Sequence, residues 1–175
     1  AYRTKYAKIK QLWWDTEAAA INAVLRPGRV APNSRTGWYT EGRFLYCRLP
    51  SGRVLAYPDP QVRKRPTPWG EEKNALTHMG VHPLTRKWTR LTVYGGLIVE
   101  NETQAIARDI MAEAMLRCEK DGRFLPILSV HDEVVAEGEP AQPMQEFERM
   151  LTQCPTWGNG LPIAVDSWTG ERYHK

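Results

Sequence analysis

Residues 124–137 decide the fold prediction: Phe124-Leu125-Pro126-Ile127-Leu128-Ser129-Val130-His131-Asp132-Glu133-Val134-Val135-Ala136-Glu137. Two apolar, β-branched runs, 124–130 and 133–137, are separated by only two residues, His131 and Asp132. This is the spacing of a tight β-hairpin. The stretch therefore predicts an antiparallel hairpin whose tip carries an imidazole and two adjacent carboxylates, those of Asp132 and Glu133.

The tip of this hairpin carries residue types that suit a hard cation. Mg²⁺ takes a few carboxylate oxygens, waters and substrate phosphates in octahedral geometry. Two such ions can stabilise the attacking and leaving oxygens of phosphoryl transfer. The alternative is that Asp132 is an ordinary turn residue, since turns favour aspartate. Spacing alone leaves both interpretations open.

A second polar pattern lies in residues 94–109, which begin with Tyr94-Gly95-Gly96. Asn101, Gln104 and Arg108 are three and four residues apart, so they share one face of a helix. Long polar side chains on one helical face can reach base edges in the minor groove and sugar-phosphate oxygens. The alternative is a solvated helix face with local side-chain pairs.

Hydrophobic periodicity elsewhere predicts a mixture of helices and strands. The expected helices cover 4–25, 101–120 and 142–153, and the expected strands cover 43–49, 53–57 and 161–165. The helix over 101–120 has an apolar stripe consisting of Ala107, Ile110, Met111, Ala114 and Cys118. Residues 58–83 contain seven prolines and glycines together with Arg63-Lys64-Arg65, a pattern that predicts an exposed, irregular connection. Residues 84–94 fit either a strand or a short helix.

Composition limits the class of protein. The 175 residues are 42% hydrophobic and 25% charged, as in ordinary globular chains. No apolar window is long enough to span a membrane. The three cysteines, Cys47, Cys118 and Cys154, lack the spacing of a metal site and are expected to be reduced thiols. The basic N-terminus has no apolar segment behind it, so we do not expect it to be a secretion signal. It also lacks an initiating Met, so we expect the chain to be part of a longer protein.

The net charge of +4 is unevenly distributed. Residues 1–93 contain 17 Lys/Arg and 6 Asp/Glu, whereas residues 94–175 contain 7 and 14. A basic half can bind a polyanion and an acidic half can bind cations. A basic surface that is merely solvated accounts for the charge equally well.

Together these stretches resemble the family A DNA polymerases (the polymerase I type), especially the phage branch. Val130-His131-Asp132-Glu133 after an apolar strand carries the resemblance, with the preceding helix Glu100-Asn101-x-x-Gln104-Ala105-x-Ala107-Arg108-Asp109. Leu49-Pro50-Ser51-Gly52-Arg53-x-Leu55-x-Tyr57-Pro58 is similar to the hairpin before the last palm helix. Leu161-Pro162-Ile163 with Trp168-x-Gly170-x-Arg172-Tyr173 is similar to the phage-type C-terminus, and Ile9-x-x-Leu12-Trp13 to the helix after the nucleotide-binding helix of the fingers.

The resemblance implies a role for each matched residue. Asp132 would be the second metal-binding aspartate, with Glu133 as the accessory carboxylate, and both would be catalytic. His131 would lie against the primer terminus, and Gln104 would contact the minor groove of the primer-template. Asn101 and Arg108 would contact DNA from the same helix. The implied cofactor is Mg²⁺ at a two-metal site, and the implied partners are primer-template DNA and dNTPs.

One departure from the family is large. Nothing in residues 1–93 is similar to the family's first aspartate, in an Asp-Tyr-Ser-like strand motif, or to the fingers helix that bears Arg, Lys and Tyr. We therefore expect the C-terminal third of a polymerase with an α+β fold. Residues 1–42 would be the end of the fingers helical region, and residues 43–175 an antiparallel palm-type sheet with packed helices.

The expected function is template-directed DNA synthesis by the intact enzyme, with this chain inactive on its own. Its remaining partner would be the missing N-terminal portion of the polymerase, and no membrane partner is expected. The protein would be encoded by a phage or prophage and would act in the cytoplasm of the bacterial host. The alternative is a non-catalytic fragment that binds DNA or completes a subunit, such as half of a split polymerase or a prophage remnant. A metal-dependent nuclease is disfavoured because no further acidic cluster accompanies Asp132.

Overall fold

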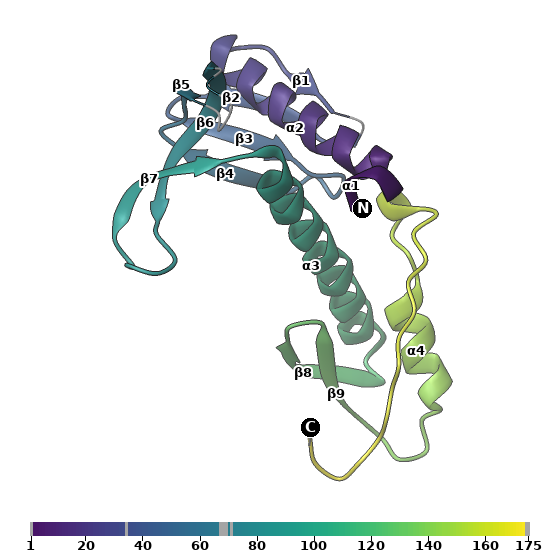
Figure 1. Cartoon of the computed structure of the whole chain (residues 1–175). Helices are drawn as coiled ribbons and strands as arrows, with labels where there is room; N and C mark the ends of the chain where they lie inside the picture. The colour runs from purple at the N-terminus through teal and green to yellow at the C-terminus, as the bar shows by residue number, and fades with distance from the viewer. Residues whose placement is uncertain (1, 34, 67–69, 71, 174–175) are drawn as a thin grey trace. The chain divides into compact units, whose positions relative to one another are not determined.

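The computed structural model describes residues 2–33, 35–66, 70 and 72–173, the side chains of residues 2 and 3 excepted. The chain divides into two compact units, Ala1–Gln104 and Ala105–Lys175. Helices alternate with antiparallel sheets along the chain, as Figure 1 shows, which confirms the predicted α+β class. No helix within the described residues is long and apolar enough to cross a membrane.

The first unit begins with helices α1 (Tyr2–Lys5) and α2 (Ala7–Leu25), where the sequence predicts a single helix over 4–25. Small residues of α2, namely Thr16, Ala19, Ala20 and Ala23, are buried. Short side chains let a helix approach a neighbouring layer closely, and α2 lies along the sheet formed by β1–β4 (Figure 1). The helix ends at Leu25, and the backbone N–H of the capping residue Arg26 donates to the Asn22 carbonyl.

The first sheet has the order β1-β2-β3-β4 and is antiparallel throughout. Its strands are β1 (Ala31–Pro32), β2 (Gly37–Glu41), β3 (Phe44–Arg48) and β4 (Val54–Pro58). Leu45 and Cys47 alternate inward from β3 and are buried with Trp38 and Tyr57 of the flanking strands. The predicted hairpin over 43–57 is confirmed, and Gly52, with φ of 89°, lies in its turn. The predicted domain boundary at 42/43 falls in the β2–β3 turn.

The prediction of an irregular connection over 58–83 is wrong. Strands β5 (Gln61–Pro66) and β6 (Glu72–Val81) lie within it and form an antiparallel sheet with β7 (Trp88–Val93). β5 is half-exposed or exposed along its whole length, and only two adjacent residues of β6, Leu76 and Thr77, are buried. A strand that is solvent-exposed on both faces shows no alternation of apolar residues, so hydrophobic periodicity did not reveal these strands. The prolines do not prevent strand formation, because they lie at the ends of strands. Residues 67–69 and 71 lie outside the described part.

Helix α3 (Gly95–Asp121) begins in the first unit and continues into the second. It starts six residues before the predicted helix, and Asn101 is therefore an interior residue. Ala114 and Cys118 of the predicted apolar stripe are buried, whereas Ala107 is exposed and does not belong to it.

The second unit contains the predicted hairpin, strands β8 (Phe124–Val130) and β9 (Glu133–Gly138). Helix α4 (Met144–Thr152) and the 3-10 turn η1 (Thr156–Gly158) follow it. Cys118, Phe124, Phe147 and Met150 form the buried core. The predicted closing strand at 161–165 is wrong, because those residues pair with no strand in the described structure. Alternation alone does not make a strand without a neighbour to accept its hydrogen bonds.

Candidate functional site

The β8–β9 hairpin presents its polar residues at a turn of two residues. Val130 pairs with Glu133, so His131 and Asp132 form the tip. His131 has φ of 52°, the left-handed region that residues other than glycine rarely adopt. Asp132 and Glu133 are both exposed. The imidazole and both carboxylates are therefore exposed to solvent at the tip. The hairpin itself is anchored, because Val134 and Ala136 of β9 pack on the core.

Two long-range contacts hold the side chains around this tip. The hydroxyl of Tyr173 donates a hydrogen bond to Glu133 Oε2 at 2.7 Å, across 40 residues of sequence. The same hydrogen bond is the main reason that the pKa of Tyr173 is raised. On α3, the guanidinium of Arg108 donates to Ser129 Oγ at 3.2 Å, two residues before His131. The structure thus links Arg108 to the hairpin, a connection that sequence spacing did not indicate.

The residues at the tip fit part of a Mg²⁺ site. Two exposed carboxylates on adjacent residues are hard oxygen donors of the kind this ion prefers. Among the described residues, no three His, Cys, Asp or Glu side chains are grouped closely enough to hold a metal ion. Asp132 and Glu133 would therefore supply a minority of the ligands, with the rest from water, a phosphate or other protein carboxylates.

Asn101 and Gln104 belong to the first unit. Gln104 is exposed, and its amide donates to Glu100 Oε1 at 3.3 Å, one turn back. Asn101 is half-buried, and its amide donates to the Tyr57 hydroxyl at 3.2 Å. Burial raises the pKa of Tyr57 to about 12, so this hydroxyl stays protonated. Gln104 therefore has a solvent-facing amide, whereas Asn101 is partly used in packing α3 against β4.

A buried carboxyl that sequence analysis did not single out lies between Asn101 and Gln104 in the chain. Glu102 is only 5% exposed, and its Oε1 accepts hydrogen bonds from Thr36 Oγ1 at 3.1 Å and Cys47 Sγ at 3.2 Å. Burial raises the pKa of Glu102, and burial beside Glu102 raises that of Cys47. The cluster fastens α3 to the first sheet. An acidic residue among polar helix neighbours carries no signal of burial.

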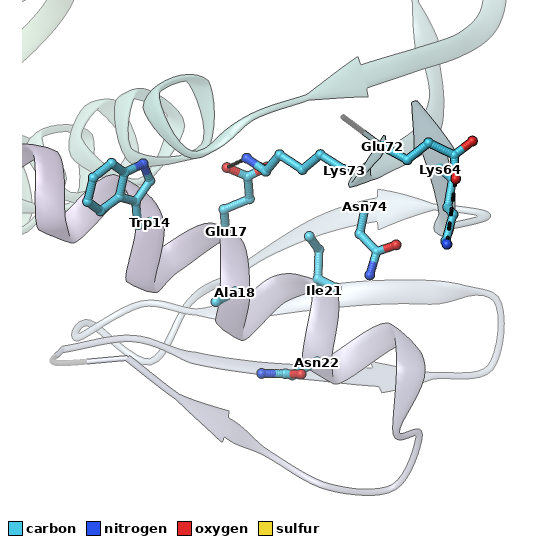
Figure 2. A pocket seen from close by; sticks show the side chains of 9 residues that line it. All are labelled: Trp14, Glu17, Ala18, Ile21, Asn22, Lys64, Glu72, Lys73 and Asn74. Atoms are coloured by element: carbon cyan, nitrogen blue, oxygen red, sulfur yellow. Dashed lines mark hydrogen bonds and ion pairs between the residues drawn. The ribbon is translucent and has the colours of Figure 1, made fainter. Parts of the chain in front are cut away.

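A groove of about 670 Å³ lies between α2 and the second sheet (Figure 2). Lys73 crosses it to Glu17, with Nζ 2.9 Å from Oε1, and Lys64 pairs with Glu72 at 3.6 Å. Each lysine thus has a carboxylate partner, so the charges within the groove largely cancel. The groove gives no particular attraction for a polyanion, and we assign it no ligand.

A comparison with curated proteins found a relative that is similar to this chain along its whole length. The chain is 36% identical over 176 aligned residues to a DNA polymerase of Bacillus phage SP02, and the alignment covers all of this chain. The chain spans about a quarter, 26%, of the length of that phage protein. No protein-family model matches the chain. No solved structure matches it either.

Proposed function

We propose that this chain is the C-terminal palm portion of a family A DNA polymerase. In the intact polypeptide it would take part in template-directed DNA synthesis, the transfer of a nucleotide from a dNTP to a primer 3′-hydroxyl. The carrying observation is the alignment with the phage DNA polymerase along the whole chain. The hairpin supports the proposal independently, because it exposes two adjacent carboxylates at the tip of a packed element.

Each residue at the tip has a proposed part. Asp132 and Glu133 would be the catalytic carboxylates and would hold Mg²⁺, which neutralises developing charge on transferring phosphates when bound. His131 would lie against the primer terminus. Its left-handed backbone supports a role for the side chain, since glycine would adopt the same conformation at lower cost.

The helix residues have proposed DNA contacts. Gln104 would donate to the minor groove through its exposed amide. Arg108 would contact DNA while holding the Ser129 end of the hairpin. Asn101 would use the polar atoms that Tyr57 leaves available. The first metal-binding aspartate, the fingers helix and the other substrate contacts would come from polypeptide outside these residues.

A chimera tests the proposal. This chain would replace the matching quarter of the Bacillus phage SP02 DNA polymerase, and primer extension would be measured with dNTPs and Mg²⁺. We expect extension by the chimera and none by the 175-residue chain alone. Asp132→Asn keeps the size of the side chain but removes the charge. It should lower extension by more than the roughly 10- to 100-fold that outer ligand partners contribute, with DNA affinity retained.

Asp166→Asn is the matched control, because Asp166 is an exposed aspartate of the same unit and is not part of the β8–β9 hairpin. It should leave extension unchanged. If Asp132→Asn behaves like Asp166→Asn, Asp132 is only a turn residue. A chimera that folds and binds DNA without extending primers would instead favour the alternative, a non-catalytic DNA-binding or subunit-completing fragment. That alternative is favoured by the incomplete set of carboxylates within the described residues.

A further inference from the structure

The hairpin formed by β6 and β7 ends in a loop with large apolar side chains in solvent. We define the hairpin tip as residues 81–88. Leu84 is 88% exposed, Trp88 60% and Val81 52%, and Val81 pairs with Trp88 across the two strands. The β6–β7 hairpin projects from the rest of the first unit in Figure 1. Clustered apolar exposure of this kind is typical of an interaction site rather than of an ordinary surface.

This tip is held in one conformation by its own hydrogen bonds. The backbone N–H of His82 donates to the Lys87 carbonyl at 2.9 Å, and that of Arg86 donates to the His82 carbonyl at 2.9 Å. The imidazole Nδ1 of His82 also accepts from the N–H groups of Leu84 and Thr85, each at 3.3 Å. The exposed side chains are therefore presented on an ordered loop, so a partner need not first order the loop on binding.

The charge around the tip favours a polyanion. Residues 73–99 contain no Asp or Glu, and Arg86 and Lys87 are exposed at the tip itself. The two apolar strand residues, Val81 and Trp88, flank these cations. Unpaired nucleotides combine a phosphate backbone with exposed apolar base faces, so they match both features at once. Aromatic side chains bind bases by stacking regardless of base identity, and neighbouring cations follow the phosphates.

We propose that the hairpin tip binds single-stranded DNA. Trp88 stacks on a base, and Arg86 and Lys87 form ion pairs with adjacent phosphates. The proposal rests on the proposed polymerase function, and it identifies an unpaired template segment as the ligand of this surface. The tip lies in the first unit and shares no residue with the β8–β9 hairpin.

Binding of a fluorescein-labelled oligo(dT) to the 175-residue chain tests the inference by fluorescence anisotropy. Trp88→Ala should weaken binding by about 5- to 150-fold, the range for loss of one stacked base. Trp88→Phe should restore most of it, because an aromatic face remains. Trp14→Ala is the matched control: Trp14 is 52% exposed in the same unit, but Lys10 Nζ already lies 4.5 Å from its ring. It should leave affinity unchanged, and thermal melting should show that all variants are folded.

The outcomes separate the two proposals. If the wild-type chain binds but Trp88→Ala and Trp14→Ala bind equally well, the hairpin tip is not the site, and the polymerase proposal is unaffected. If the wild-type chain binds neither oligo(dT) nor a primer-template duplex, DNA binding by this chain itself fails. If Trp88→Ala loses binding to anionic phosphatidylserine vesicles but keeps its affinity for oligo(dT), the tip is a membrane contact, and our inference is wrong. If the wild-type chain dimerises and Trp88→Ala abolishes the dimer without changing the affinity for oligo(dT), the tip binds a second copy of the chain, and our inference is wrong.

Discussion

Gly95→Ala is expected to destabilise the protein, although alanine is the better helix former. Gly95 is the first residue of α3 and lies against the backbone of α2. A Cβ at this position would lie 2.0 Å from the Trp13 carbonyl oxygen, 2.6 Å from its carbonyl carbon and 3.1 Å from its Cα. These are backbone atoms of a helix, so no side-chain rotation relieves the overlap. Either α2 or the start of α3 has to move.

The expected cost follows from two opposing effects. Alanine in place of glycine in a helix interior gains up to about 1 kcal/mol, and less at the first residue. Overpacking costs about 1–3 kcal/mol, and contact with immobile backbone places this case at the upper end. Movement of Gly95 also strains the bond from its N–H to Glu17 Oε2, 3.3 Å long and buried. We expect a net loss of about 2–3 kcal/mol, which lowers the melting temperature by about 4–12 °C.

Thermal and urea denaturation of the 175-residue chain, followed by circular dichroism, would measure this effect. Gly37→Ala is the matched control, because its Cβ would meet only Val30 Cγ1, at 3.4 Å. The control should lie within about 0.5 kcal/mol of the wild type. A Gly95→Ala protein as stable as the wild type, or more stable, would show that helix propensity outweighs steric overlap and would refute the close approach of α2 and α3.

Three further outcomes are expected. Burial raises the pKa of Glu102, so the folded state keeps the carboxyl proton to higher pH than the unfolded chain does. The contribution of the protonated carboxyl to the free energy of unfolding is complete below about pH 4.5 and is lost as the pH rises through the raised pKa of the folded state. Glu102→Gln should therefore show a smaller decrease in the free energy of unfolding between acid and neutral pH, and an unchanged decrease would exclude Glu102 as its source. Tyr173→Phe should lower stability by no more than about 1 kcal/mol but speed hydrogen exchange near the C-terminus, since it removes the donor to Glu133. Neutralising residues 63–65 should flatten the dependence of log DNA affinity on log salt, whereas Gln104→Ala should leave that slope unchanged, because an amide contact releases no counterion; equal slopes for the two would count against this division of roles.

Local sequence signals predicted the elements whose pattern is complete within a short window. The β8–β9 hairpin was predictable because two apolar runs and a two-residue tip occur together in 14 residues. Helix α3 was predictable from its periodicity, but its start was not. Its first turn is fixed by the packing of Gly95 against α2, a contact between residues 82 positions apart.

Structure that depends on distant partners was not predictable in the same way. Strands β5 and β6 bury few side chains, so no alternation of apolar and polar residues marks them in the sequence. The residues from Leu161 to Val165 do alternate, but they pair with no strand in the described structure. At the candidate site, the residue types of the tip were visible in the sequence. The contacts of Tyr173 with Glu133 and of Arg108 with Ser129 were not, because they depend on how distant segments fold together.

The left-handed backbone at His131 makes this position useful for separating two kinds of mutational tolerance. Glycine, and to a lesser degree asparagine, fit that conformation as well as or better than histidine, whereas β-branched residues fit it worst. In a saturation library, a display screen for folded protein should therefore enrich glycine and asparagine at residue 131 and deplete valine and isoleucine. A replication-dependent selection on the phage chimera should favour histidine instead, if the imidazole contributes more to the reaction than its backbone costs. The difference between the two rankings would measure, at one codon, how far selection for activity departs from selection for folding.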